Sequence, residues 1–312
     1  MTSKRYLTLS TYFRTLFGHR VQKIPLDAGS SCPNRDGSLS VHGCTFCNQL
    51  GSGTGLAEQG LSLEAQYAAW RTRYHRSMPT ARFMAYVQSY SNTYGPVRRL
   101  EQLLAALRGL PDLVGLAIGT RPDCLDEEKL RLLACSPWSQ TWLDLGLQSV
   151  HAHTLQRIQR GHDVNCFAHW ATRAAQYGLK VCAHVITGLP GETLADFKQT
   201  ISFVNHLPVA GIKIHNLLIC RGAAMEQEWR TGSLTLLSRE ETIAWTAQGL
   251  ALLRPDIVVH RVNADPAGDE LIAPQWARDK RALLRDINAH LYTTDTWQGR
   301  DLGYPLSPQF NP

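Results

Sequence analysis

Short apolar runs alternate with amphipathic stretches along most of the chain. In the amphipathic stretches, apolar residues recur every three or four positions, as Leu100, Leu103 and Leu107 do, which indicates helices that bury one face. The short runs are almost continuously apolar, which is typical of strands in a sheet that is covered on both sides. Alternation of the two patterns predicts βαβ units and a parallel sheet.

Six strands of one sheet are predicted, and we therefore expect an α/β fold, a partial (β/α)6 TIM-like barrel with a C-terminal α/β extension. Gly18 is expected to end the first helix and Ser62 to cap the second. The strands are predicted at 21–26, 82–90, 113–119, 141–148, 180–187 and 211–219. The helices are predicted at 7–17, 62–78, 97–110, 126–134, 153–159, 164–177 and 194–205.

The last third of the chain continues with a helix at 239–253, a strand at 257–262 and a helix at 276–291. We expect residues 1–220 to form the barrel core and residues 221–312 to form an extension packed on the same domain. The tail at 295–312 is rich in Pro and Gly, and it is predicted to be extended.

Composition describes a globular protein, with 44% hydrophobic and 19% charged residues. The formal net charge of +6 is compatible with a nucleic-acid partner but equally with a slightly basic protein of another class. No apolar run approaches the roughly 20 residues of a membrane span, and the N-terminus lacks the apolar core of a signal peptide. We expect a cytoplasmic protein without a membrane partner, in which cysteines are ligands or core residues rather than disulfides.

Three cysteines stand close together in a loop rich in Gly, Ser and Asn, in the spacing Cys32, Cys44 and Cys47. A structural zinc site takes four protein ligands, and His42 is the nearby candidate for a fourth. Three thiolates on a [4Fe–4S] cluster leave one iron open for another ligand, such as the amino and carboxylate groups of S-adenosylmethionine (SAM). The spacing favours the cluster, and zinc or a set of redox or inert thiols are the alternatives.

Polar residues gather where the predicted strands end, which in a (β/α) barrel is the rim that carries the chemistry. The cysteine loop follows the first strand and belongs to the same rim, which strengthens the cluster hypothesis. Gln148 and Arg160 are candidates for holding ribose hydroxyls and the methionyl carboxylate of SAM, because the Arg fork suits a carboxylate. Gly188 opens a tight turn that either approaches a ligand or merely joins a strand to a helix. Further candidates for cofactor binding at this rim are Gln88, Tyr90 and Ser149.

Histidine and lysine inside apolar strands leave two interpretations open. His184 is either a core histidine or a residue that faces the barrel interior, because alternate strand positions face opposite ways. Lys213 and His215 share one face of the sixth strand. If that face is the interior, the two are candidates for substrate binding or proton transfer, and otherwise His215 is a core polar group.

Taken together, several motifs resemble the radical SAM superfamily, in its YhcC/YtqA-type branch related to the Elongator catalytic subunit and to oxygen-independent coproporphyrinogen oxidase. The resemblance runs from about Tyr6 to Leu291. It is carried by the motifs PLDAG, SCPNRDG, GCTFCN, QSYSNTY, IGTRPD, LGLQSVH, RGH, GLPGET and GIKIHNL.

This resemblance implies a [4Fe–4S] cluster on the three loop cysteines, SAM contacts at Gln148 and Arg160, and a 5′-deoxyadenosyl radical that abstracts hydrogen. In the coproporphyrinogen oxidase relatives an acidic residue contacts the ribose where this chain has His184, so the chain departs from that pattern. The resemblance further implies an electron donor such as flavodoxin or ferredoxin, and tRNA wobble-uridine modification as one activity. A radical SAM enzyme of a small metabolite and a metal-stabilised nucleic-acid-binding protein without turnover are the alternatives.

Overall fold

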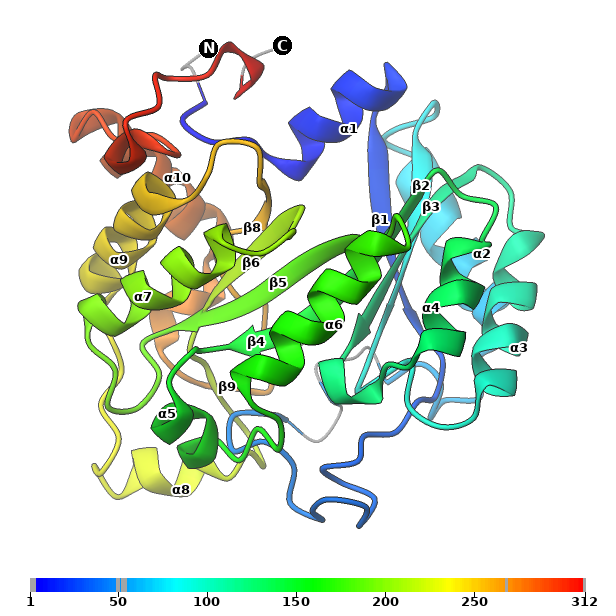
Figure 1. Cartoon of the computed structure of the whole chain (residues 1–312), viewed down its shortest axis with the longest axis horizontal. Coiled ribbons are helices and arrows are strands. Elements are labelled where there is room, and N and C mark those ends of the chain that lie inside the picture. The colour runs from blue at the N-terminus through cyan, green and yellow to red at the C-terminus, as the bar shows by residue number, and fades with distance from the viewer. Residues whose placement is uncertain (1–3, 49–50, 52–54, 267–268, 311–312) are drawn as a thin grey trace.

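The computed structural model describes residues 4–48, 51, 55–266 and 269–310. Its main sheet has seven parallel strands in the order β1-β2-β3-β4-β5-β6-β8. The sheet curls into a partial barrel with β1 and β8 at its edges (Figure 1). The strands are β1 Val21–Asp27, β2 Arg82–Gln88, β3 Leu113–Thr120, β4 Gln140–Gln148, β5 Lys180–Thr187, β6 Gly211–Asn216 and β8 Val258–Arg261.

Helices connect these strands and cover the outer face of the sheet, as expected for right-handed βαβ units (Figure 1). A second, two-stranded antiparallel sheet joins β7 Ile219–Cys220 to β9 Leu271–Ala273. The helices are α1 Leu9–Phe17, α2 Leu63–His75, α3 Val97–Arg108, α4 Glu127–Ala134, α5 Ala152–Arg157, α6 Val164–Gln176, α7 Leu194–Asn205, α8 Met225–Arg230, α9 Arg239–Leu252 and α10 Lys280–Thr293.

Local sequence signals set the helix ends. Gly18 ends α1 in a left-handed conformation with a φ of 70°, as predicted. Ser62 caps α2, because its Oγ accepts the N–H of Ala65 at 3.2 Å. Thr193 and Asp196 form a reciprocal capping box at the start of α7. The helix end at Gly18 and the cap at Ser62 confirm two sequence predictions, which needed no tertiary information.

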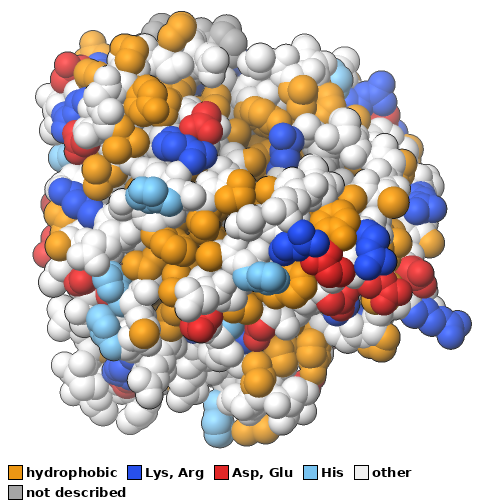
Figure 2. Space-filling model, viewed as in Figure 1, with side chains coloured by type: hydrophobic (Ala, Val, Ile, Leu, Met, Phe, Trp, Pro, Cys, Tyr) orange, Lys and Arg blue, Asp and Glu red, His pale blue; other side chains and the backbone are white. Residues whose placement is uncertain are grey.

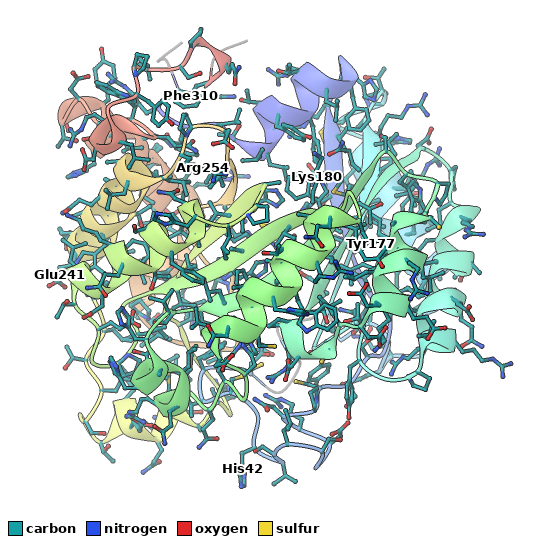
Figure 3. All side chains as sticks on the ribbon, viewed as in Figure 1. His42, Tyr177, Lys180, Glu241, Arg254 and Phe310 are labelled. Carbon is teal, nitrogen blue, oxygen red and sulfur yellow. The ribbon has the colours of Figure 1, made fainter. Side chains whose placement is uncertain are left out.

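Alternation along the strands separates two packed layers. Outward residues such as Leu143 and Val185 join the main core between the sheet and its helices. Inward residues such as Trp142 and Cys182 form a smaller apolar cluster that closes the barrel at the end where the strands begin. Phe310 belongs to that cluster, and Figure 3 shows it at the opposite end of the molecule from His42, which lies at the tip of the cysteine loop.

The structure differs from the predicted elements where turns set the end of a strand and where strand pairing sets the sheet to which a segment belongs. The strand predicted at 82–90 stops at Gln88, because Ser89 and Tyr90 have φ angles of 89° and 56°. The strand predicted at 211–219 ends at Asn216, and its last residues pair instead in the small antiparallel sheet. The strand predicted within the extension is β8, the seventh strand of the barrel sheet.

The predicted extended tail contains short helical turns at Arg300–Leu302 and Pro308–Phe310. Gln298 fixes the tail to the barrel, because its Oε1 accepts the N–H of Leu7 at 2.9 Å and its Nε2 donates to the carbonyl of Ile257 at 2.8 Å. Residues 311–312 of the predicted tail lie outside the described residues. No helix in the described ranges is both long and apolar enough to cross a membrane.

Candidate functional site

The cysteine loop leaves the end of β1 and folds back on itself. The N–H of Gly43 donates to the carbonyl of Asn34 at 2.6 Å, and the φ of Gly43 is 77°. A Cβ at this position would lie 2.8 Å from Nε of Arg35, so the turn requires glycine. The N–H of Thr45 donates to the carbonyl of Ile158 at 3.1 Å, which fixes the loop to the segment after α5.

All three loop thiols line one cavity of about 830 Å³ that extends into the barrel. Cys44 is 6% exposed, and its Sγ accepts from Nη1 of Arg160 at 3.5 Å. The Sγ of Cys32 accepts from Oγ of Ser91 at 3.8 Å. The pKa of Cys47 is raised to about 11, chiefly by burial and also by the nearby Cys44, although Arg35 opposes the rise.

The spacing of these thiols bears on the kind of metal site. Among the described residues, one group of three side chains brings its ligand atoms within 4.8 Å of one another, and it consists of Asp144, Cys182 and His184. The loop thiols do not form such a group, whereas sulfurs around one tetrahedral zinc lie about 4 Å apart at Zn–S distances near 2.3 Å. His42, the candidate fourth ligand, is exposed at the loop tip (Figure 3). Three convergent but separated thiols fit a larger group, such as an iron–sulfur cluster.

Arg160 lies beside the thiols at the rim, where Gly146 makes room for it. Nη2 of Arg160 donates to the carbonyl of Gly146 at 3.0 Å, and its buried Nε has no partner. A Cβ on Gly146 would clash with this guanidinium and would lie 2.6 Å from Nε2 of Gln148. Arg160 and Gln148 therefore converge on the cavity that the three thiols line. A buried guanidinium with an unpaired donor beside three thiols suits a carboxylate of a bound cofactor.

The other rim candidates are split between the cavity and the surrounding structure. Gln88 and Tyr90 line the cavity, and the guanidinium of Arg35 lies 5.7 Å from the centre of the Tyr90 ring. Ser149 is fully buried outside the cavity lining, where its Oγ donates to a carboxylate oxygen of Glu192.

Gly188 also stands outside the cavity lining. Its φ is 75°, and a Cβ there would lie 2.8 Å from Cγ of Leu237. In the structure the close approach that glycine allows is therefore to Leu237, and a role in cofactor binding stays a prediction.

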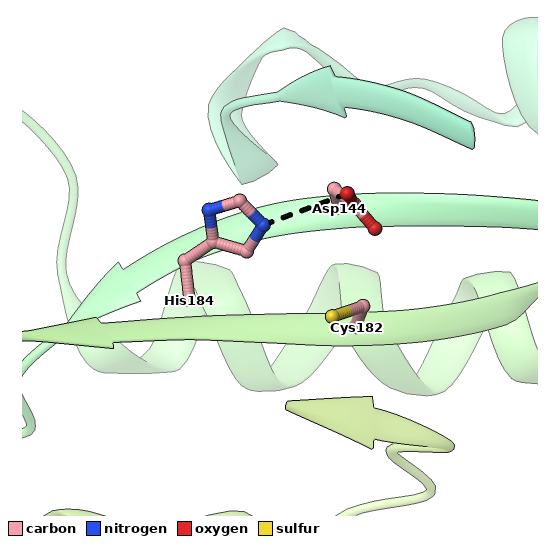
Figure 4. A group of neighbouring side chains, drawn as sticks. All are labelled: Asp144, Cys182 and His184. Carbon is pink, nitrogen blue, oxygen red and sulfur yellow. Dashed lines mark ion pairs between the residues drawn. The ribbon is translucent and has the colours of Figure 1, made fainter. Parts of the chain in front are cut away.

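His184, Lys213 and His215 all face the barrel interior and line the cavity, which decides between the two orientations left open by the sequence. Nζ of Lys213 lies 2.6 Å from Oδ2 of Asp144 and donates to the Tyr86 hydroxyl at 2.9 Å. Nε2 of His184 lies 3.7 Å from the same Asp144 oxygen, a contact that Figure 4 marks with a dashed line. A polar layer therefore lies below the rim.

Burial and neighbouring charges set the protonation of this layer. Burial alone would raise the pKa of Asp144, but the ammonium groups of Lys213 and Lys23 hold it well below its usual value. Burial and, to a smaller extent, the charge of Lys213 lower the pKa of His184 to about 4. Burial and Arg261 likewise hold the pKa of His215 well below its usual range. Burial and neighbouring charges therefore favour a carboxylate at Asp144 and neutral imidazoles at His184 and His215.

Sequence reasoning missed Asp144, Lys23, Tyr86 and His260, which complete the layer. Asp144 interrupts an apolar strand and shares a strand face with Trp142 and Gly146, two positions before and after it. A charged residue on a face of such a strand was the signal available in the sequence. Lys23 lies 3.8 Å from the Asp144 carboxylate. Its neighbours in sequence gave no comparable signal, because Gln22 and Lys23 are adjacent polar residues in β1 and the strand shows no regular alternation.

Comparisons with known proteins agree with this arrangement. The family described as "Radical SAM superfamily" matches residues 40–204, and the "Radical SAM C-terminal domain" matches residues 209–293. The protein YtqA of Bacillus subtilis is 36% identical over 96% of this chain and 93% of its own length. Human Elongator complex protein 3 is 30% identical over 51% of this chain and 29% of its own length.

The solved structure of the archaeal Elp3 from Methanocaldococcus infernus has the same fold, with a TM-score of 0.68 and 15% identity. The match covers 89% of this chain and 64% of the archaeal one. The Elongator-type proteins therefore share the fold but carry additional chain that has no counterpart in the match.

Proposed function

Because this chain belongs to the radical SAM superfamily and is an enzyme of that superfamily, we propose that Cys32, Cys44 and Cys47 hold a [4Fe–4S] cluster beside a bound SAM molecule. When bound, the cluster supplies the electron that cleaves SAM to a 5′-deoxyadenosyl radical, which takes a hydrogen atom from the substrate. The chain itself has to bind both molecules, orient them and exclude water.

A single observation carries this proposal: the thiols of the three loop cysteines and the buried guanidinium of Arg160 line the same cavity. The Cys32 sulfur is contacted by Ser91, and the Cys44 sulfur is contacted by Arg160. Three thiol ligands leave one iron open, and Arg160 stands 3.5 Å from the Cys44 sulfur, where a carboxylate bound to that iron would meet it. The Arg160 Nε lacks a partner and is buried, so it would gain a charge-assisted hydrogen bond from such a carboxylate.

Other rim residues would orient the rest of SAM. Gln148 carries amide donors and an acceptor at the end of β4, next to Arg160, and would bind ribose hydroxyls. Gln88, the last residue of β2, and Tyr90, two residues later, line the same cavity. The Tyr90 ring offers a flat apolar surface for the adenine or the methionyl chain.

Anaerobic reconstitution with iron and sulfide tests the cluster. We expect a brown protein with about four irons per chain, whose visible absorption bleaches with dithionite and which releases 5′-deoxyadenosine from SAM. Cys44→Ala should abolish both signals. Cys135→Ala is the matched control, because Cys135 is exposed and outside the cavity. A full cluster and full 5′-deoxyadenosine release in Cys44→Ala would overturn the proposal.

For the substrate, we propose a tRNA wobble uridine. The similarity to Elongator complex protein 3 and the net charge of +6 support this substrate. On the face shown in Figure 2, basic side chains are interspersed with acidic ones, so RNA would be bound elsewhere. Deletion of the gene should change one wobble nucleoside in bulk tRNA, and the wild-type gene but not Cys44→Ala should restore it. An unchanged nucleoside profile would indicate a small metabolite instead.

The electron for SAM cleavage is proposed to come from a flavodoxin or a ferredoxin in the cytoplasm. Either reduced protein should replace dithionite in the release of 5′-deoxyadenosine. Failure of both, with dithionite still active, would exclude these two donors.

A further inference from the structure

Below the SAM site the barrel holds more cations than the protein's own carboxylates balance. Lys23 of β1, Lys213 of β6 and Arg261 of β8 all line the cavity. Lys213 and Arg261 are register partners on the neighbouring strands β6 and β8. Lys23 lies on β1, at the other edge of the sheet, and its Nζ is 3.3 Å from Nδ1 of His260 on β8. The two edges of the open sheet therefore meet at this cationic layer.

Among the described residues, Asp144 and Asp265 are the carboxylates of the cavity lining, and Asp265 is paired with Lys280, which leaves Asp144 for these three cations. Asp144 has a fully buried side chain, and its Oδ2 lies 2.6 Å from Lys213 and 3.8 Å from Lys23. In the described part of the chain, no other carboxylate forms an ion pair with either lysine, and Arg261 forms none. Three cations against one carboxylate leave a formal excess of two positive charges at the barrel floor.

Buried charge without a partner is unfavourable, and Lys23 shows this cost. Burial lowers the pKa of Lys23, and Asp144 only partly opposes the effect. Two ring atoms around the layer also lack hydrogen-bond partners, namely Nε2 of His215 and Nε2 of His260. Cations that outnumber the carboxylates around one cavity are complementary to an anionic ligand.

We infer that this floor is a binding site for an oxyanion of the substrate, a carboxylate or a phosphate, held by Arg261, Lys23 and Lys213. Arg261 supplies a planar fork and the lysines supply point charges. The inference rests on the proposed function, because the same cavity holds the thiols at its mouth and the cations at its floor. An anion bound at the floor orients the rest of the substrate toward the 5′ carbon of SAM.

A metal ion is the competing occupant, because Asp144, Cys182 and His184 have ligand atoms within 4.8 Å of one another (Figure 4). The Asp144 oxygen already contacts the Lys213 ammonium at 2.6 Å, and a cation there would be repelled. Burial also raises the pKa of the Cys182 thiol well above its usual value, so this side chain is a poor thiolate ligand. The layer suits an anion better.

Anion binding to the reconstituted full-length protein tests the inference. Acetate and inorganic phosphate are titrated separately by calorimetry, with chloride at equal ionic strength as the reference. At least one of them should bind with a stoichiometry of one, and which one binds distinguishes a carboxylate from a phosphate group. Zinc and magnesium are titrated in parallel.

Arg261→Gln and Lys23→Gln should each weaken that binding by about tenfold or more, as expected for a charge-assisted hydrogen bond. Arg261→Lys keeps the charge, loses the fork and should fall between. Lys198→Gln on the outer helix α7 is the matched control and should bind like wild type. The visible cluster absorption should be unchanged in all four variants, which separates this test from that of the cluster.

Three results would overturn the inference: neither acetate nor phosphate binds wild type beyond the chloride reference, Arg261→Gln and Lys23→Gln bind the anion as wild type does, or zinc binds in a manner that requires Asp144. If the cluster fails to assemble while anion binding behaves as described, the proposed function fails and the oxyanion site stands.

Discussion

The ammonium of Lys213 lies 2.6 Å from a carboxylate oxygen of Asp144, across the β5 strand that separates their two strands. Lys213 is 3% exposed and Asp144 is 1% exposed, so neither charge is solvated. This buried pair links two strands of the barrel and organises the polar layer beneath the proposed SAM site. Its properties lead to the first prediction.

Removing one partner of this pair should be strongly destabilising. Asp144→Asn or Lys213→Met leaves a buried charge without its counterpart, which costs about 3–5 kcal/mol. Urea unfolding of each variant measures this loss. Arg230→Gln is the control, because Arg230 pairs with Glu226 on the surface of α8, where such a pair contributes about 0–1 kcal/mol. Equal stabilities of Asp144→Asn and Arg230→Gln would contradict the prediction.

Arg160→Gln should weaken SAM binding without loss of the cluster. Arg160 contacts the Cys44 sulfur but is not a thiol ligand, so iron content should be retained. Loss of a charged hydrogen bond to the SAM carboxylate should raise the dissociation constant by about tenfold to a hundredfold. Equilibrium dialysis with labelled SAM measures it. Arg157→Gln is the control, since this exposed arginine on α5 pairs with Glu228. Unchanged SAM affinity in Arg160→Gln would contradict the role of Arg160 in binding the SAM carboxylate.

A methyl group at Gly146 should act through Arg160. The Cβ of Gly146→Ala would collide with the Arg160 guanidinium and approach Gln148 Nε2 to 2.6 Å. We expect weaker SAM binding and a loss of about 1–3 kcal/mol in unfolding free energy from overpacking.

Gly109→Ala provides the matched control for Gly146→Ala. Gly109 has a φ of −86°, and no atom lies within 4 Å of a Cβ built there. Its stability should be unchanged or slightly increased, because alanine restricts the unfolded chain. If both variants behave alike in SAM binding and in urea unfolding, the close approach at Gly146 has no functional role.

His184 should make stability depend on pH. Burial lowers its pKa to about 4 in the folded protein from 6.5 in the unfolded chain. The unfolded chain therefore takes up a proton below pH 6.5 that the folded protein does not, and stability falls as the pH falls from 7 to 5. This group should contribute about 1–2 kcal/mol of that loss. Urea unfolding at both pH values should show a smaller loss in His184→Asn than in wild type. The same loss in both proteins would assign it to other groups.

The sequence alone determined the elements that depend on local pattern. Helical periodicity placed α3 at Leu100, Leu103 and Leu107, and the continuous apolar runs predicted a parallel sheet. The three closely spaced cysteines identified the loop that lines the cavity mouth. These features follow from side-chain periodicity and from short-range spacing, which a linear pattern records directly.

Only the tertiary structure decided what the interior positions do. Strand alternation defines two faces of a strand but not which face is inside. The direction in which the sheet curls is what places Lys213 and His215 in the cavity. The closure also recruited β8 from the predicted extension and brought Lys23, Asp144 and Arg261 into one layer. Their electrostatic relationship arises from strands far apart in sequence, and long-range pairing of that kind leaves no trace in local composition.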